Sequence, residues 1–265
     1  KIAFAILLKG RVSFRKILNA AHCWFAQKFH FVKAAPFPFM INFELWNECN
    51  AQCTFCRTDD GVIYDQNPEN KGQVPIPKGK MSLELYKEII EQSKDHILIA
   101  VLYVNGEPLM YKGLYEAIQF ASDRGVATLI STNGELLTEN NIKKLLESGL
   151  DFVKIAISGF SQDIYTVQHR GCHIEKIKDN LETLARLRDL GQHKILTMLD
   201  YVYYQYNSHE YQSALDFGQR LGFMVSRRPG NLFKLSEEHP ELAQHEKPQE
   251  APKHLPVKNF CDWPW

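Results

Sequence analysis

Three cysteines lie within eight residues of one another in the segment ECNAQCTFCRT. Cys49, Cys53 and Cys56 are separated by three and then by two residues, and no fourth cysteine follows nearby. Three thiolates can hold a metal ion or an iron–sulfur cluster and leave one coordination position open, whereas closed structural sites use four protein ligands. The spacing therefore predicts a metal centre with one position open to water, substrate or a cofactor.

Two other interpretations stay open from the spacing alone. One is a structural zinc site with a distant fourth ligand, such as Cys23 or a histidine, and the other is a disulfide with a spare thiol, which the crowding disfavours. Six cysteines in 265 residues are too few for a disulfide-rich scaffold. Cys172 is expected to be a buried free thiol. This cysteine usage indicates a reducing compartment, and we expect a cytoplasmic protein.

Strand-like and helix-like segments alternate along the chain from residue 40, and the first strand leads directly into the cysteines. The expected strands are 40–46, 97–104, 126–131, 152–157, 194–203 and 223–227, and the expected helices are 82–95, 112–124, 138–148, 174–190 and 209–221. Such alternation predicts parallel βα units. Six units are too few for a closed eight-stranded barrel, so we expect an α/β fold, an open partial (β/α)6 TIM-like barrel. Its catalytic groups should gather at the C-terminal ends of the strands.

Motifs at these strand ends give the chain a resemblance to a known family. The order Cys49-x3-Cys53-x2-Cys56, with Phe55 before the last cysteine, resembles the cluster-binding loop of the radical S-adenosylmethionine (radical SAM) superfamily. Later strands end in Asn105-Gly106-Glu107-Pro108, similar to the family's Gly-Gly-Glu-Pro motif, in Ser131-Thr132-Asn133-Gly134 and in Ser158-Gly159, with Arg170-Gly171 downstream. The resemblance covers roughly residues 40–227.

The resemblance implies an enzyme and two cofactors. A [4Fe–4S] cluster would be bound by Cys49, Cys53 and Cys56, and S-adenosylmethionine (SAM) would chelate the open iron. One electron from a flavodoxin-like or ferredoxin-like donor would then cleave SAM and yield a 5′-deoxyadenosyl radical. That radical would abstract hydrogen from a substrate, while the protein positions the substrate and excludes water.

The resemblance also assigns SAM-binding roles to residues of this chain. Glu107 and the carbonyls near Gly106 would accept hydrogen bonds from the SAM amino group, and Gly106 would allow close backbone approach. Arg170 would pair with the SAM carboxylate because its planar fork matches carboxylate geometry. Three further residues would hydrogen-bond the SAM carboxylate or ribose: Ser131, Asn133 and Ser158. Phe55 would pack near the adenine.

The tail bears on the substrate. Residues 228–265 read as an exposed linker followed by the start of a SPASM-type or twitch-type extension, in which Cys261 is a candidate ligand of an auxiliary iron–sulfur cluster. Relatives with this extension modify peptides or oxidise sugars, so we expect a peptide or protein side chain as substrate. One alternative is an oxidoreductase-type activity, the dehydrogenation or epimerisation of a sugar or aminocyclitol. The other alternative is a non-catalytic zinc-binding module.

The N-terminal part, residues 1–39, precedes the expected barrel domain 40–227. Its early apolar run, 2–8, is too short to span a bilayer, and no signal-peptide cleavage site is convincing. Apolar residues recur at helical spacing between Phe14 and Phe25. That face suits a membrane surface or the domain itself, and we expect it to pack on the domain without membrane contact. With 31 basic and 31 acidic side chains, we expect no nucleic-acid partner.

Overall fold

The computed structural model describes residues 12–29, 37–54, 56, 77–230, 235 and 239–244. Within these residues, six parallel strands form one sheet in the order β1-β2-β3-β4-β5-β6. The strands are β1 Met40–Asn42, β2 Ile99–Val101, β3 Ala127–Thr132, β4 Phe152–Ile157, β5 Leu196–Tyr203 and β6 Met224–Pro229. Every strand pairs with its neighbours in sequence, and β1 and β6 remain edges in the described chain. The predicted open partial barrel is confirmed.

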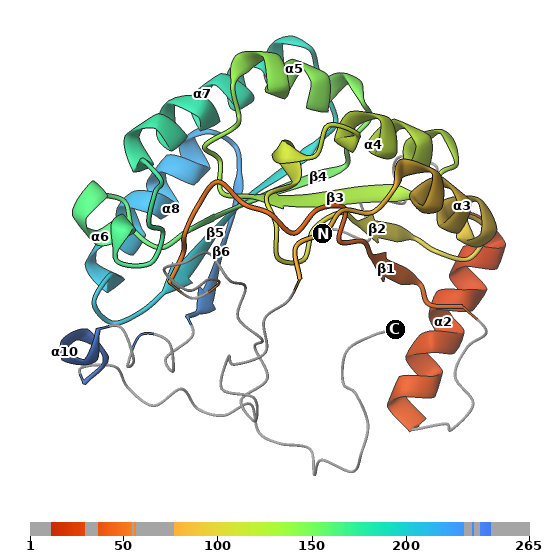
Figure 1. The fold of residues 1–265 in the computed structure, drawn as a ribbon, viewed down its shortest axis with the longest axis horizontal. Helices are drawn as coiled ribbons and strands as arrows, with labels where there is room; N and C mark the ends of the chain where they lie inside the picture. The colour runs from red at the N-terminus through yellow and green to blue at the C-terminus, as the bar shows by residue number, and fades with distance from the viewer. Residues whose placement is uncertain are drawn as a thin grey trace.

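Five long helices cover the convex face of this curved sheet (Figure 1). They are α3 Leu83–Ser93, α4 Leu114–Asp123, α5 Glu139–Glu147, α7 Ile174–Leu190 and α8 Tyr211–Arg220. The side-chain oxygens of Ser82 and Thr138 cap α3 and α5, as expected of residues that satisfy free N–H groups at a helix start. Three short helices were not predicted: η1 Pro108–Met110, α6 Gln162–Thr166 and α10 Pro240–Ala243. The short helix η2, Ser208–Glu210, begins the predicted helix 209–221 and leads directly into α8.

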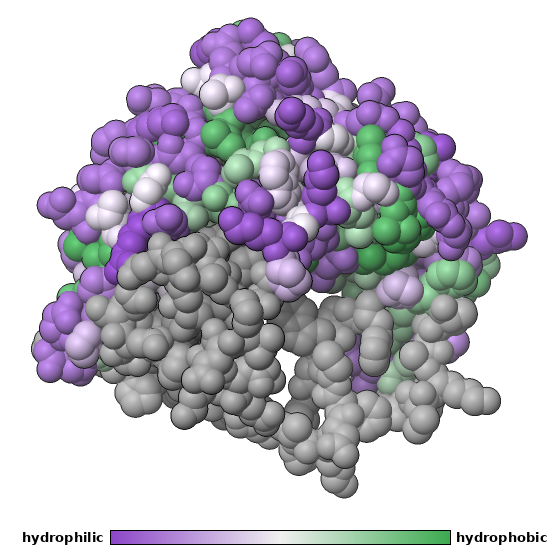
Figure 2. All heavy atoms as spheres, in the orientation of Figure 1, coloured by the Kyte–Doolittle hydropathy of each residue, from purple (hydrophilic) through white to green (hydrophobic). Residues whose placement is uncertain are grey.

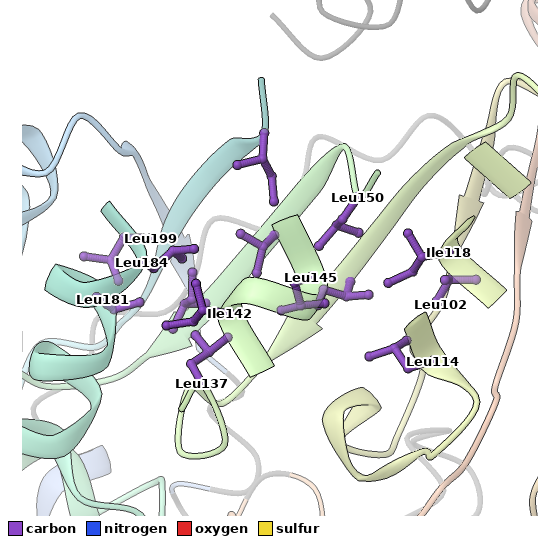
Figure 3. Close-up of a cluster of buried hydrophobic side chains, with 14 of the residues drawn as sticks. Leu102, Leu114, Ile118, Leu137, Ile142, Leu145, Leu150, Leu181, Leu184 and Leu199 are labelled. Atoms are coloured by element: carbon purple, nitrogen blue, oxygen red, sulfur yellow. The ribbon is translucent and has the colours of Figure 1, made fainter. Parts of the chain in front are cut away.

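The main hydrophobic core lies between the sheet and these helices. Figure 3 shows leucine and isoleucine side chains of the strands and of α4, α5 and α7 meeting in this layer, among them Ile118, Leu145 and Leu199. The outer surface over the helices is largely hydrophilic (Figure 2). Burying apolar area at this interface stabilises the packing of the helices on the sheet by about 25 cal/mol per Å².

The concave face of the sheet has a different character. Along β3 and β4 the fully buried residues alternate with half-buried ones, because successive side chains of a strand point to opposite faces. Ile130 and Ile155 belong to the core under the helices, whereas Ser131 and Lys154 line a cavity on the concave side. The fold therefore offers polar groups to the inside of the partial barrel.

The N-terminal helix α2, Phe14–Phe29, packs on the barrel through the face opposite to the predicted one. We expected the apolar residues to be buried, but Lys16, Asn19, Cys23 and Ala26 are buried instead. Polar contacts explain the orientation: Lys16 Nζ donates to a backbone oxygen of the barrel at 2.5 Å, and Asn19 Nδ2 donates to two others at 3.1 and 3.2 Å.

The predicted linker also needs correction. Strand β6 continues to Pro229, so Arg228 belongs to the sheet and not to the linker. Leu235 is fully buried against Val202 and Tyr204, so this stretch is not uniformly exposed as expected. The following residues from 245 onward, including Cys261, lie outside the described residues. No described helix combines the length and hydrophobicity needed to cross a membrane.

Candidate functional site

The three clustered cysteines lie on a loop after β1 and line one cavity of about 270 Å³. Two backbone hydrogen bonds hold this loop: Gln52 N donates to Arg170 O at 3.0 Å, and Thr54 N donates to Gln168 O at 3.1 Å. The Thr54 hydroxyl also donates to the Gln168 side chain at 2.5 Å. The cysteine loop is thus fixed by the segment that contains the predicted Arg170-Gly171 motif.

Gly106 brings the end of β2 against the start of the cysteine loop. A Cβ atom at this position would lie 1.9 Å from the carbonyl oxygen of Trp46, well inside any permitted contact. Next along the chain, Glu107 N donates to Glu48 O at 2.9 Å. Only glycine allows the two backbone segments to approach this closely. The predicted role of Gly106 toward SAM remains a prediction.

The Glu107 carboxylate joins β2 to the end of β3. Its oxygens accept hydrogen bonds from Leu109 N at 3.1 Å, from the Thr132 hydroxyl at 2.8 Å and from Asn133 N at 2.9 Å. Burial raises the pKa of the Glu107 carboxyl to about 7, although these hydrogen bonds oppose the rise. The group lines the cavity beside the thiols, where a cationic ligand would favour its ionised form.

Two other predicted residues line the same cavity, Ser131 and Asn133. The Asn133 side-chain amide lies 3.7 Å from Cys49 Sγ and donates to Asn50 Oδ1 at 2.9 Å. Amide donors beside a thiolate stabilise its charge and tune a bound cluster. Asn133 therefore links the third strand to the cysteine loop as well as facing the cavity.

Ser158 and Arg170 are placed differently from these residues. Ser158 is completely buried, and its hydroxyl lies 2.6 Å from His169 Nδ1. Neither Ser158 nor Arg170 lines the cavity, although Arg170 is only partly buried and its backbone contacts the cysteine loop. Their roles toward SAM remain predictions. Phe55 and Cys261 fall outside the described residues.

The cavity contains charged residues that the sequence reasoning missed. Lys154 of β4 and Arg228 of β6 line it, and both face the buried Asp200 of β5. Asp200 Oδ2 accepts from Arg228 Nε at 2.8 Å and lies 3.7 Å from Lys154 Nζ, while its other oxygen accepts from the Ser226 hydroxyl at 2.6 Å. A usable signal was present for Lys154 and Asp200, because charged residues inside buried strands are rarely found without a partner.

The donor set fits an iron–sulfur cluster. Among the described residues, no three His, Cys, Asp or Glu side chains are close enough together to enclose a single metal ion. The thiols of Cys49, Cys53 and Cys56 instead surround a shared cavity, and a cubane cluster takes each thiolate on a different iron. Cys23 was considered as a distant fourth ligand, but its thiol donates to Phe37 O, which precedes β1. It therefore lies at the amino-terminal end of β1, whereas the three clustered cysteines follow the carboxyl-terminal end.

Cys172 is buried as expected and has no disulfide partner among the described residues. Burial, with the negative charge of Glu135 next, raises the pKa of its thiol to about 12. A thiol that stays protonated at neutral pH is a poor metal ligand, because metals bind the thiolate. Cys172 is therefore a structural neighbour of the site.

Comparison with protein families identifies the chain once this geometry is known. The family model of the radical SAM superfamily matches residues 43–217, more than half of the chain. The chain belongs to the radical SAM superfamily. It is an enzyme sequence of the class that uses SAM, and membership implies a [4Fe–4S] cluster.

Curated relatives share only part of their length with this radical SAM chain. An S-adenosylmethionine-dependent nucleotide dehydratase of Flammeovirga pacifica is 29% identical over 49% of this chain and 42% of its own length. An AdoMet-dependent heme synthase of Nitratidesulfovibrio vulgaris is 25% identical over 69% of this chain and 45% of its own length. The chain thus spans less than half of these relatives.

Solved structures show the same radical SAM fold. Streptococcus suis SuiB bound to the precursor peptide SuiA matches with a TM-score of 0.58 and 13% identity, covering 85% of this chain and 49% of that one. SuiB bound to S-adenosylmethionine matches with a TM-score of 0.56 and 14% identity, covering 85% of this chain and 48% of that one. At these identities the likeness concerns the fold, and it agrees with the open partial barrel.

Proposed function

We propose that this chain binds a [4Fe–4S] cluster through Cys49, Cys53 and Cys56 and cleaves SAM reductively, so that a 5′-deoxyadenosyl radical abstracts hydrogen from a substrate. The observation that carries the proposal is the shared cavity. The thiols of all three cysteines line it together with Glu107 and Asn133, at the C-terminal ends of the strands. The bound group supplies the electron for bond cleavage; the protein supplies the positioning.

The chain's own residues divide the cavity into two sides. Glu107 and Ser131 lie on the thiol side, where the Glu107 carboxylate can accept hydrogen bonds from an ammonium group and the Ser131 hydroxyl can bond a carboxylate or ribose. Arg170 is the proposed partner of the SAM carboxylate. Lys154 of β4 and Arg228 of β6 line the cavity on strands farther from β1 and the cysteine loop. We propose that these two residues bind the substrate.

The proposed substrate is a peptide or protein side chain, acted on in a reducing cytoplasmic setting with a flavodoxin-like or ferredoxin-like donor. The subgroup resemblance of the tail supports this class, and an auxiliary cluster that includes Cys261 belongs to the same proposal. A small anionic molecule is the second candidate. Two cations face one carboxylate in the cavity, and one curated relative is a nucleotide dehydratase.

The test is anaerobic reconstitution followed by metal and sulfide analysis, then incubation with reductant and SAM. We expect iron and sulfide to be bound and 5′-deoxyadenosine to form, and we expect both to be lost in Cys53→Ala. Cys23→Ala is the matched control, because it removes a thiol that lies outside the cavity. Stoichiometric zinc without iron would show that the non-catalytic zinc-binding alternative is correct.

The substrate class needs a separate readout. Deuterated candidates, peptides in one series and nucleotides or sugars in another, should transfer deuterium to 5′-deoxyadenosine only when they are substrates. Arg170→Ala should weaken SAM binding without changing iron content. An unchanged dissociation constant in this variant would remove Arg170 from the proposed SAM site.

A further inference from the structure

Helix α2 carries most of the large hydrophobic side chains that are exposed in the described chain. The described residues include nine exposed large hydrophobic side chains, and six of these nine belong to α2. We call these six the α2 apolar face: Phe14, Ile17, Leu18, Trp24, Phe25 and Phe29. Phe14 is 73% exposed and Phe29 is 54% exposed. Contiguous exposed apolar surface of this kind marks an interaction site.

The α2 apolar face points away from the barrel. The buried residues Lys16, Asn19, Cys23 and Ala26 recur every three or four positions and so form one stripe along the helix. The six apolar residues occupy the opposite side at 100° per residue. The orientation is fixed by the hydrogen bonds of Lys16 and Asn19 to the barrel, so the apolar face cannot turn inward without breaking them.

Charge distinguishes this region from the rest of the protein. The first 43 residues contain seven of the 31 lysines and arginines and none of the 31 aspartates and glutamates. On α2, Arg15 is exposed at the border of the apolar face. Lys28 is exposed at the C-terminal end of that face, where its Nζ lies 4.7 Å from the centre of the Trp24 ring. The partner of this face must therefore accept apolar side chains and also carry negative charge around them.

We propose that α2 docks this protein on the surface of an anionic lipid bilayer. An amphipathic helix with aromatic and aliphatic residues on one side and basic residues beside them lies in the interface plane, with its apolar face at the acyl boundary. Trp24 suits this level because indole combines an apolar ring with a polar N–H. Arg15 and Lys28 contact the headgroups.

The position of α2 leaves the cavity accessible in such a complex. Lys16 and Asn19 contact backbone oxygens of Gly125, Pro38 and His96, which precede β3, β1 and β2 respectively. Helix α2 thus packs at the amino-terminal ends of the strands, beside β1 (Figure 1). The thiol-lined cavity lies at their carboxyl-terminal ends, so docking does not cover it.

A second copy of the chain is the less suitable occupant. Joining two α2 apolar faces would bring the Arg15 and Lys28 side chains of both copies together without any acidic residue on either helix. Such like charges repel each other at short range. A bilayer containing anionic lipid offers the opposite charge together with an apolar layer.

The experiment is co-sedimentation of the full reconstituted protein with vesicles made of equal parts phosphatidylglycerol and phosphatidylcholine. We expect binding, with a blue shift in Trp24 fluorescence that disappears in Trp24→Phe. Phe25→Glu should reduce the partition coefficient at least about tenfold, because it places a charge at the acyl boundary. Arg15→Gln and Lys28→Gln should each reduce it about fivefold, and high salt should have a similar effect.

Leu190→Glu is the matched control, because Leu190 is 74% exposed at the end of α7 and should leave vesicle binding unchanged. Circular dichroism and thermal unfolding verify that each variant is folded. Absence of binding overturns the proposal, as does equal binding to pure phosphatidylcholine. A dimer that forms in solution and depends on Phe25, without vesicle binding, assigns the face to a second copy instead.

Discussion

The hydroxyl of Thr132 donates a hydrogen bond to the carboxylate of Glu107 at 2.8 Å, and both residues are almost completely buried. This contact connects the Gly-Glu-Pro segment after β2 with the end of β3. Two backbone N–H groups, from Leu109 and Asn133, complete the environment of the carboxylate. The cavity wall beside the thiols is therefore held by one acidic side chain rather than by the sheet alone.

Titration of Glu107 should make stability depend on pH. Its pKa is about 7 in the folded protein, against an ordinary value of 4.5, because the carboxyl is buried. The neutral carboxyl therefore stabilises the folded state fully below pH 4.5, and this contribution is lost as the pH rises to about 7. In urea unfolding of the cluster-free protein, the wild type should lose about 3 kcal/mol over this window relative to Glu107→Gln. Parallel pH profiles of the two proteins would contradict this.

His169 should produce the opposite dependence. Complete burial, with Arg228 as a lesser cause, lowers the pKa of the imidazole to about 3. The unfolded chain binds a proton below about pH 6.5 and the folded protein does not, so stability is present above pH 6.5 and is lost as the pH falls toward 3. The loss should approach about 5 kcal/mol, and it should be much smaller in His169→Asn, which can still hydrogen-bond to Ser158. Urea midpoints between about pH 7 and pH 4 would follow the larger part of this loss, about 3 kcal/mol.

Sequence reasoning located the strands and the cluster loop because both depend on local patterns. The alternation of apolar runs predicted β4 and α7 to the residue, and the three cysteines with Gly106 and Glu107 marked one side of the cavity. It failed where contacts between distant segments decide the outcome. The packed face of α2 depends on backbone oxygens more than 15 residues away, and helical periodicity carries no information about those acceptors.

The same limit explains the missed cavity residues. Lys154, Asp200 and Arg228 come from three different strands, and only parallel pairing brings them together. Lys154 and Asp200 were each visible as a charged residue within an apolar strand, but their partners were not. The boundary predicted at residue 228 separated Arg228 from the sheet, because composition changes there before the strand ends.

The pairing of Arg228 with Asp200 predicts a specific effect on the substrate. Arg228→Gln should destabilise the protein by only about 1–2 kcal/mol, because Arg228 is partly exposed and Lys154 remains near the buried carboxylate. It should raise the KM of an anionic substrate about tenfold or more and leave SAM binding unchanged. Arg227→Gln is the matched control, because Arg227 lies over the rings of Tyr203 and Tyr211 and does not line the cavity. Equal KM values in the two variants would exclude Arg228 from substrate recognition.

Gly106 gives the sharpest structural prediction. Its Cβ position lies 1.9 Å from Trp46 O and 2.9 Å from Asn47 Cα, both backbone atoms that no rotamer change can move. Gly106→Ala must therefore displace the segment that leads into Cys49, and overpacking of this kind costs about 1–3 kcal/mol. Iron incorporation should fall with stability, because the cysteine loop begins there. Gly79→Ala provides the control, since nothing lies within 4 Å of its Cβ position. Iron content and the thermal unfolding midpoint of both variants, measured side by side, test this prediction. Retention of a full cluster in Gly106→Ala would show that the cysteine loop can move without loss of the site.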